Sequence, residues 1–250
     1  MLILIFAGCS KCLKAFSRIE FLPGKFKSNI SGFNINSWPA RNGTQHKIDA
    51  AKTRSAVNGT HQKQLEQFGC RWSELFELEY FDPIRGHSID PMHCLFLGIA
   101  KTVTKHYLTT GLIPKAKIKS LQAAVDMIRV PSSIGRIPRK ISSGFASFTA
   151  DQWKNWTLIY SPLVLRDVLP TKHYRIWMTF VNATKLITRK TIKKQDVTLA
   201  KQLYIKFCLS IEQEFGEAFI TPNFHMLCHL PDVMDDYGPV YSFWCYSFER

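Results

Sequence analysis

Helical periodicity dominates the second half of the chain. Between residues 195 and 215, apolar side chains recur at i, i+3, i+4 and i+7, a spacing that predicts an amphipathic helix. Thr149 and Gln152 form the pattern of a capping box, in which each residue's side chain satisfies the other's backbone N–H. Helices are expected at about 114–130, 149–160, 171–189 and 195–215. Their apolar stripes are those of core helices, and we assign no chemistry to them.

The first half reads differently. Residues 2–6 are continuously apolar, as in a buried strand, and residues 8–48 read as a loop-rich stretch with several Pro and Gly breakers. A polar helix is expected at about 49–68. Asp90 followed by Pro91 has the pattern of a helix N-cap and first turn, and the apolar residues after it predict a long buried helix. These patterns predict a mainly α fold with a partial α/β portion.

The charge balance favours a polyanionic partner. The 250 residues hold 33 Lys and Arg against 19 Asp and Glu, a formal net charge of +14. Nucleic acid is the commonest partner of such a chain, although ribosomal and membrane-surface proteins share the excess. Arg136, Arg139 and Lys140 lie in a loop with Gly and Pro hinges, where phosphate contacts are easily made; the alternative is a solvated surface loop. No apolar run approaches the ~20 residues that span a bilayer, so no membrane partner is expected.

Two residue pairs have the spacing of metal ligands. Cys9 and Cys12 stand two residues apart at a turn, and His225 and His229 stand four apart on one helical face. Together they supply the four ligands that tetrahedral zinc prefers. Each pair alone is a weak signal, because apolar neighbours of the histidines also fit a core helix in which imidazoles are simply hydrogen-bonded. His93 is an alternative fourth ligand.

Two carboxylates stand out by their neighbours. Asp90 lies three residues before His93, and its alternative role is that of a helix N-cap. Glu249 closes an aromatic-rich segment, where a carboxylate at the edge of an apolar core can bind a divalent cation. Its alternative role is a surface ion pair with Arg250.

Several motifs follow one another in order along the chain. They are GCSKCLKAF, Trp38-Pro39-x-Arg41 with a nearby His46, FDPIRGHSIDPMHCLFLGIAK, NFHMLCHL and DDYGPVYSFWCYSFER. This order resembles the DDE transposases of CACTA (En/Spm-like) elements and their fungal relatives, over nearly the whole chain. The resemblance implies an RNase H-like core interrupted by a helical insertion, with regions at 1–94 (partial core), 95–221 (insertion) and 222–250 (return to the core).

The resemblance also implies roles for matched residues. Cys9 and Cys12 match the family's Cys-x-x-Cys pair, and the two histidines match its His pair. Asp90 and His93 match a D-x-x-H motif that supports the catalytic site, and Glu249 matches the catalytic Glu. Two catalytic Asp residues of the family have no match and would lie before Met1, so we expect a fragment or relic truncated at both ends.

The missing carboxylates decide what activity to expect. A DDE enzyme places two Mg²⁺ ions with three carboxylates, and one Glu cannot do this. We therefore expect an intracellular, nuclear, DNA-binding protein that derives from an enzyme cleaving and joining DNA but is inactive as it stands. The alternative is a non-catalytic DNA-binding or interaction module stabilised by zinc. Mg²⁺ belongs to the intact ancestor, and structural Zn²⁺ to this chain.

Overall fold

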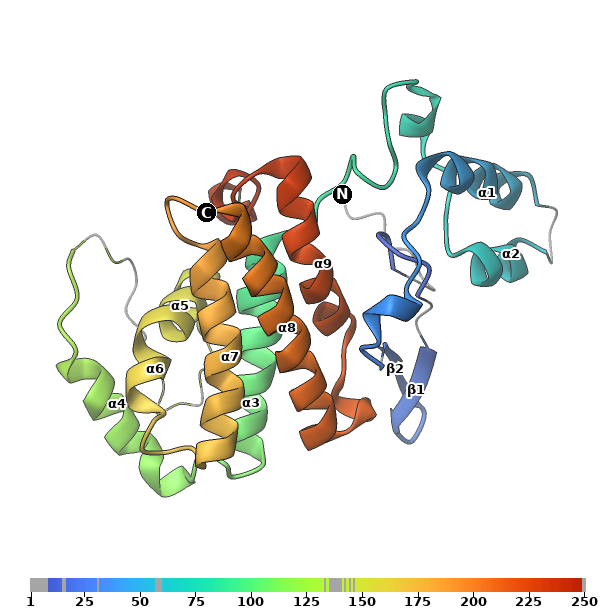
Figure 1. Cartoon of the computed structure of the whole chain (residues 1–250). Coiled ribbons are helices and arrows are strands. Elements are labelled where there is room, and N and C mark those ends of the chain that lie inside the picture. The colour runs from blue at the N-terminus through green and yellow to red at the C-terminus, as the bar shows by residue number, and fades with distance from the viewer. Residues whose placement is uncertain are drawn as a thin grey trace. The chain divides into compact units, whose positions relative to one another are not determined.

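The structure is a computed structural model that describes residues 9–14, 17–30, 32–56, 60–132, 134, 141, 143, 145 and 147–248. The described chain is mainly helical, as predicted (Figure 1). Its strands form one antiparallel hairpin, β1 paired with β2. The strand predicted at residues 2–6 lies outside the described residues.

The described elements follow one another in the order strand hairpin, then helices. The strands are β1 (Ser17–Leu22) and β2 (Lys25–Asn29). The α-helices are α1 (Gly43–Ser55), α2 (His61–Phe68), α3 (Lys101–Thr109), α4 (Ile118–Met127), α5 (Ala150–Asn155), α6 (Ser161–Val164), α7 (Thr171–Ile187), α8 (Lys194–Phe215) and α9 (Pro222–Tyr237). The π-helical segments are η3 (Met92–Ala100) and η5 (Trp156–Tyr160). Short 3₁₀ turns are η1 (Ile35–Ser37), η2 (Glu74–Glu77), η4 (Lys115–Lys117), η6 (Glu217–Phe219), η7 (Val240–Ser242) and η8 (Cys245–Ser247).

The chain divides into two compact units. Unit 1 comprises Met1–Ser88 and Ile211–His229, and unit 2 comprises Ile89–Ser210 and Leu230–Arg250. The divisions fall within α8 and α9. These are packing units, and the three sequence regions 1–94, 95–221 and 222–250 stay a prediction.

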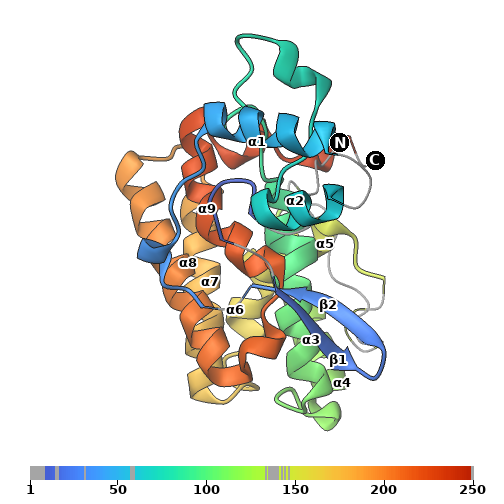
Figure 2. The same cartoon turned by 90° about the vertical axis from the view of Figure 1, so that its right-hand side faces the viewer.

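Unit 1 contains more regular structure than its sequence predicts. The stretch 8–48, expected to be loop-rich, includes the hairpin β1–β2 and the beginning of α1 (Figure 2). Gly24 makes the hairpin turn with a left-handed φ of 72°, and its N–H donates to the Glu20 carboxylate at 2.7 Å. The Asn42 side chain caps α1 by accepting the Gln45 N–H at 3.0 Å. The predicted polar helix at 49–68 is observed as two helices, α1 and α2.

Unit 2 is built on the predicted apolar stripes. Phe180 of α7 contacts Tyr204 and Phe207 of α8, with ring centroids 6.1 and 5.1 Å apart. The indole N–H of Trp156 donates to the Thr104 hydroxyl of α3 at 3.3 Å, so η5 and α3 are joined by a buried hydrogen bond. The two helices α7 and α8 run side by side in both views (Figures 1 and 2). The sequence therefore located this core correctly.

The two predicted helix starts that have a capping side chain, at Thr149 and at Asp90, are confirmed. Thr149 and Gln152 form the expected capping box at α5, and the Trp153, Trp156 and Tyr160 rings are buried. The helix after Asp90 continues from η3 into α3, and its apolar face is buried. Among the described residues, none of the helices combines the length and apolar character that crossing a membrane requires.

Candidate metal centre

The loop that carries the two cysteines is closed by its own backbone. The Cys9 N–H donates to the Lys14 carbonyl oxygen at 2.9 Å, and the Lys11 N–H donates to the Cys9 sulfur at 3.2 Å. A backbone N–H directed at a sulfur favours the thiolate, which is the form that binds metals. Both cysteine side chains are buried. The loop thus presents two sulfurs away from bulk water.

Helix α9 carries the two histidines on one face. Residues four apart on a helix lie one above the other, and the His225 and His229 Nε2 atoms are 3.1 Å apart. Pro222 at the first position suits the start of this helix. Phe224, Leu227 and Leu230 are buried. Helix α9 is therefore both a core helix, which was the alternative explanation of its sequence, and the carrier of two paired imidazoles.

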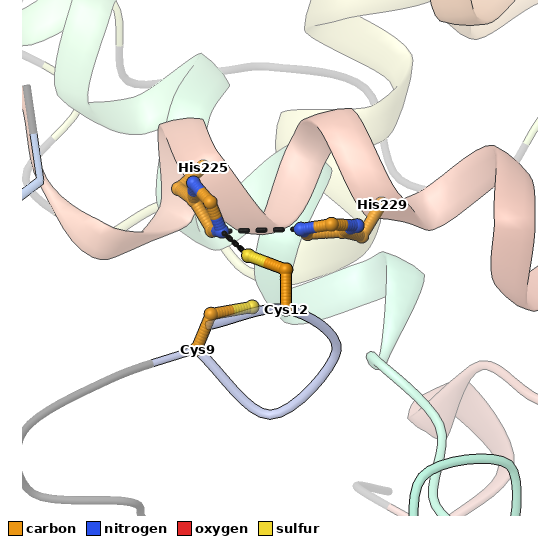
Figure 3. A group of neighbouring side chains, drawn as sticks. All are labelled: Cys9, Cys12, His225 and His229. Atoms are coloured by element: carbon orange, nitrogen blue, oxygen red, sulfur yellow. Dashed lines mark hydrogen bonds between the residues drawn. The ribbon is translucent and has the colours of Figure 1, made fainter. Parts of the chain in front are cut away.

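The cysteine loop and α9 bring the four side chains together (Figure 3). One ligand atom from each of Cys9, Cys12, His225 and His229 lies within 4.8 Å of all the others. The prediction that these two pairs, far apart in sequence, come together in space is confirmed. Because all four belong to unit 1, the cluster is formed inside one compact unit.

The spacing of the ligand atoms fits a tetrahedral zinc site. Zn–N bonds of ~2.1 Å and Zn–S bonds of ~2.3 Å place two ring nitrogens about 3.4 Å apart, and a nitrogen and a sulfur about 3.6 Å apart. The observed separations are 3.1 Å between the two Nε2 atoms and 3.3 Å between Cys12 Sγ and His225 Nε2. Shifts of a few tenths of an ångström bring these two separations to the tetrahedral values, and all four ligand atoms lie within 4.8 Å of one another. The cluster can thus hold a metal such as zinc.

Arg41 holds the backbone of the cysteine loop. Its Nε donates to the carbonyl oxygens of Cys9 and Cys12 at 2.7 and 3.1 Å, and its Nη1 donates to that of Phe68 at 3.1 Å. Backbone hydrogen bonds also pair the loop with the segment before α1, at Leu13 with Pro39 and at Arg41 with Lys11. This support fixes the loop before any metal binds.

Trp38 covers the histidine side of the cluster. Its ring centroid is 4.2 Å from that of His225 and 6.1 Å from that of His229. The Trp38 side chain is itself buried. Trp38 and Arg41 entered the sequence analysis as letters of a motif without a role, and the structure gives them positions next to the ligands.

The protonation of the cluster follows from its hydrogen bonds. Burial opposes ionisation of Cys9, but hydrogen bonds from Cys12, His225 and His229 outweigh it and lower the pKa of this thiol. The hydrogen bond to Cys9, together with burial, raises the pKa of Cys12. Burial lowers the pKa of His225. These contacts therefore favour the thiolate at Cys9, the thiol at Cys12 and the neutral imidazole at His225. The neutral imidazole is the form in which histidine binds a metal.

Asp90 and His93 lie elsewhere, in unit 2. They form a separate cluster with Cys245, again with one ligand atom each within 4.8 Å of the others. His93 is therefore not part of the four-residue cluster, contrary to its proposed role as an alternative ligand there. Asp90 acts as the predicted cap, because its carboxylate accepts the N–H groups of Met92 and His93 at 3.3 and 2.9 Å. Cys245 was not predicted from the sequence, since Asp90 and His93, its partners in the cluster, lie more than 150 residues before it in the chain.

The remaining predicted site residues lie outside the described residues. They are the proposed catalytic Glu249 and the proposed DNA-binding residues Arg136, Arg139 and Lys140. Their assignments stay predictions.

Comparison with known proteins adds no relative. No protein-family model, no curated protein and no solved structure matches this chain.

Proposed function

We propose that this chain derives from a DDE-type DNA transposase and acts as a zinc-stabilised DNA-binding unit rather than as a nuclease. The observation that carries the proposal is the convergence of Cys9, Cys12, His225 and His229 on one point. The Cys pair and the His pair, which are far apart in sequence, together supply the four metal ligands that the resemblance to the transposases implies. The support for a transposase origin is this agreement between motif order and geometry.

The proposal separates binding from catalysis. Two-metal cleavage of DNA needs carboxylates that place both Mg²⁺ ions, and the resemblance matches one such residue here, Glu249. We therefore propose that Mg²⁺ chemistry belongs to a complete enzyme with its other carboxylates. In that enzyme the helices of 95–221 are the insertion into an RNase H-like core, and the protein works in the nucleus.

The positive charge supplies the DNA affinity in this proposal. A net charge of +14 attracts phosphates without reading sequence. The proposed contact loop contributes Arg136, Arg139 and Lys140. Each neutralised phosphate changes the slope of log affinity against log salt by about 0.9. Three lost contacts are therefore expected to flatten the slope by about 2–3.

The test measures affinity for duplexes of unrelated sequence by fluorescence anisotropy in a salt series. We expect similar affinities for all sequences, falling steeply from ~50 to ~200 mM salt. Changing Arg136, Arg139 and Lys140 together to Gln should flatten the slope. The same change at the exposed Lys190, Lys193 and Lys194 removes equal charge and should leave the slope nearly unaltered. Affinity that does not respond to salt contradicts the DNA-binding proposal.

A plasmid-nicking assay with Mg²⁺ or Mn²⁺ tests the second half of the proposal. No nicking is expected from the purified protein. Metal-dependent nicking that disappears in Glu249→Gln would show that the chain carries a complete catalytic site.

A further inference from the structure

We propose that Asp90, His93 and Cys245 form a second metal site, in unit 2, which binds zinc through three protein ligands and leaves a fourth position open to water. Their ligand atoms lie within 4.8 Å of one another. The site shares no residue with the four-residue cluster of unit 1. Its existence does not depend on the proposed DNA-binding function.

The donor set selects the metal. A thiolate, an imidazole and a carboxylate together suit zinc, whereas Mg²⁺ and Ca²⁺ prefer oxygen ligands alone. Three protein ligands with an open position are the arrangement of zinc sites that keep an exchangeable water. The His93 side chain is 49% exposed, while that of Asp90 is 14% exposed. The site is therefore anchored in the protein on one side and reached by solvent on the other.

Asp90 is already oriented for ligation. Its Oδ1 accepts the N–H of Cys245 at 2.9 Å, and its Oδ2 accepts the N–H of His93 at 2.9 Å. The same Oδ2 also forms a hydrogen bond with His93 Nδ1, which zinc would have to replace if both of these atoms became its ligands. Ligating carboxylates are usually fixed by hydrogen bonds of this kind. The hydrogen bond from the Cys245 N–H thus holds the segment around Cys245 next to Asp90.

The segment that carries Cys245 is held by cation–π contacts and a hydrogen bond. Lys154 Nζ lies over the Trp244 and Tyr246 rings, 5.7 and 4.7 Å from their centroids. The Tyr246 hydroxyl donates to the Ala150 carbonyl oxygen at 3.0 Å. These contacts fix the residues on both sides of Cys245. Its sulfur therefore approaches Asp90 and His93 as part of a packed structure.

The competing account is a helix cap without metal. Asp90 caps the helix that begins at Met92, and its contact with His93 is then an ordinary side-chain interaction. Asp90→Asn distinguishes the two accounts, because the single side-chain oxygen of Asn can still cap the helix by accepting the His93 N–H, whereas Asn lacks the charge of a zinc ligand and the second acceptor for the Cys245 N–H. A cap-only role predicts unchanged metal binding in this variant.

The experiment counts metal. The purified protein, residues 1–250, is stripped with chelator, titrated with Zn²⁺ alone and analysed for bound zinc after gel filtration. We expect two equivalents in the wild type, one per cluster. His93→Gln and Cys245→Ser should each bind one, and Asp90→Asn should bind its second equivalent at least tenfold more weakly. His106→Gln, on the same continuous helix but outside the cluster, should still bind two.

Co²⁺ substitution gives a readout that misfolding does not mimic. The sulfur-to-cobalt absorption should fall by the contribution of one thiolate in Cys245→Ser, while the signal from the unit 1 cluster remains. Cys12→Ser should lose the unit 1 equivalent and keep that of unit 2, so failure of either site is seen separately. One equivalent in the wild type, unaffected by His93→Gln, Cys245→Ser and Asp90→Asn, would overturn the proposal.

Discussion

Replacing Cys12 by Ser should remove the metal-dependent part of the stability of unit 1. Cys12 and His225 are 213 residues apart in sequence, and their side chains meet at 3.3 Å. A metal that bridges them cross-links the chain over this length. A metal that binds the folded state but hardly the unfolded chain stabilises the folded state by RT ln(1 + [metal]/Kd), about 4 kcal/mol when free metal is about 1,000 times Kd. We take this as the stabilisation that bound metal adds to unit 1.

The assay is thermal unfolding with and without chelator. At about 2–4 °C per kcal/mol for a chain of this length, 4 kcal/mol corresponds to a midpoint about 8–16 °C lower in chelator. In a His93→Gln background, which lacks the proposed second site, Cys12→Ser should unfold near the midpoint of the chelated protein and respond little to chelator. Cys70→Ser is the matched control, because Cys70 is also buried in unit 1 but lies outside the cluster. It should keep the full chelator response.

Two outcomes would refute this reasoning. If chelator leaves the wild-type midpoint unchanged, the cluster does not hold a stabilising metal. If Cys12→Ser keeps the whole chelator response of the wild type, the metal effect arises elsewhere, for example at the Asp90 cluster.

Two further predictions concern residues around the cluster. Arg41→Ala should weaken zinc affinity about 10–100-fold, as loss of residues that orient ligands typically does, in a competition assay with a chromophoric chelator; affinity within twofold of wild type would contradict the role given to Arg41. For His46, burial, more than the nearby charge of Arg41, lowers the pKa to about 4 from 6.5. The folded state therefore favours neutral His46, and stability should fall by about 2–3 kcal/mol as the pH drops from ~6.5 towards ~4. His46→Gln should remove this loss in urea unfolding with chelator at pH 7 and pH 4.5, and an unaltered pH dependence would show that other groups cause it.

The sequence predicted what depends on local spacing. The two-residue gap between Cys9 and Cys12 and the four-residue gap between His225 and His229 fix the geometry within each pair, whatever the rest of the chain does. The capping box at Thr149 was found for the same reason. Helix periodicity is likewise a local property, and it located the core of unit 2.

The missed features depend on distant partners or on competing local signals. Cys245 has no ligand near it in sequence, and its approach to Asp90 depends on packing around Tyr246. The hairpin β1–β2 was not predicted, because Pro23 and Gly24 are typical of loops as well as of the tight turn that they make here between the two strands. The role of Arg41 could not be predicted, because it bonds to main-chain oxygens that carry no sequence signal.

The arrangement of the unit 1 cluster reduces what metal binding has to achieve. Its ligands come as two local pairs, so only one long-range closure is needed, between the cysteine loop and α9. Arg41 and Trp38 make part of that closure with hydrogen bonds and ring contacts that need no metal. A short Cys pair alone offers zinc two ligands in the unfolded chain, so binding there is weak and subtracts little from the stabilisation of the folded state. Metal binding and the stability of the folded state are therefore strongly coupled, because each ligand pair is local in sequence and the two pairs meet only when the chain folds.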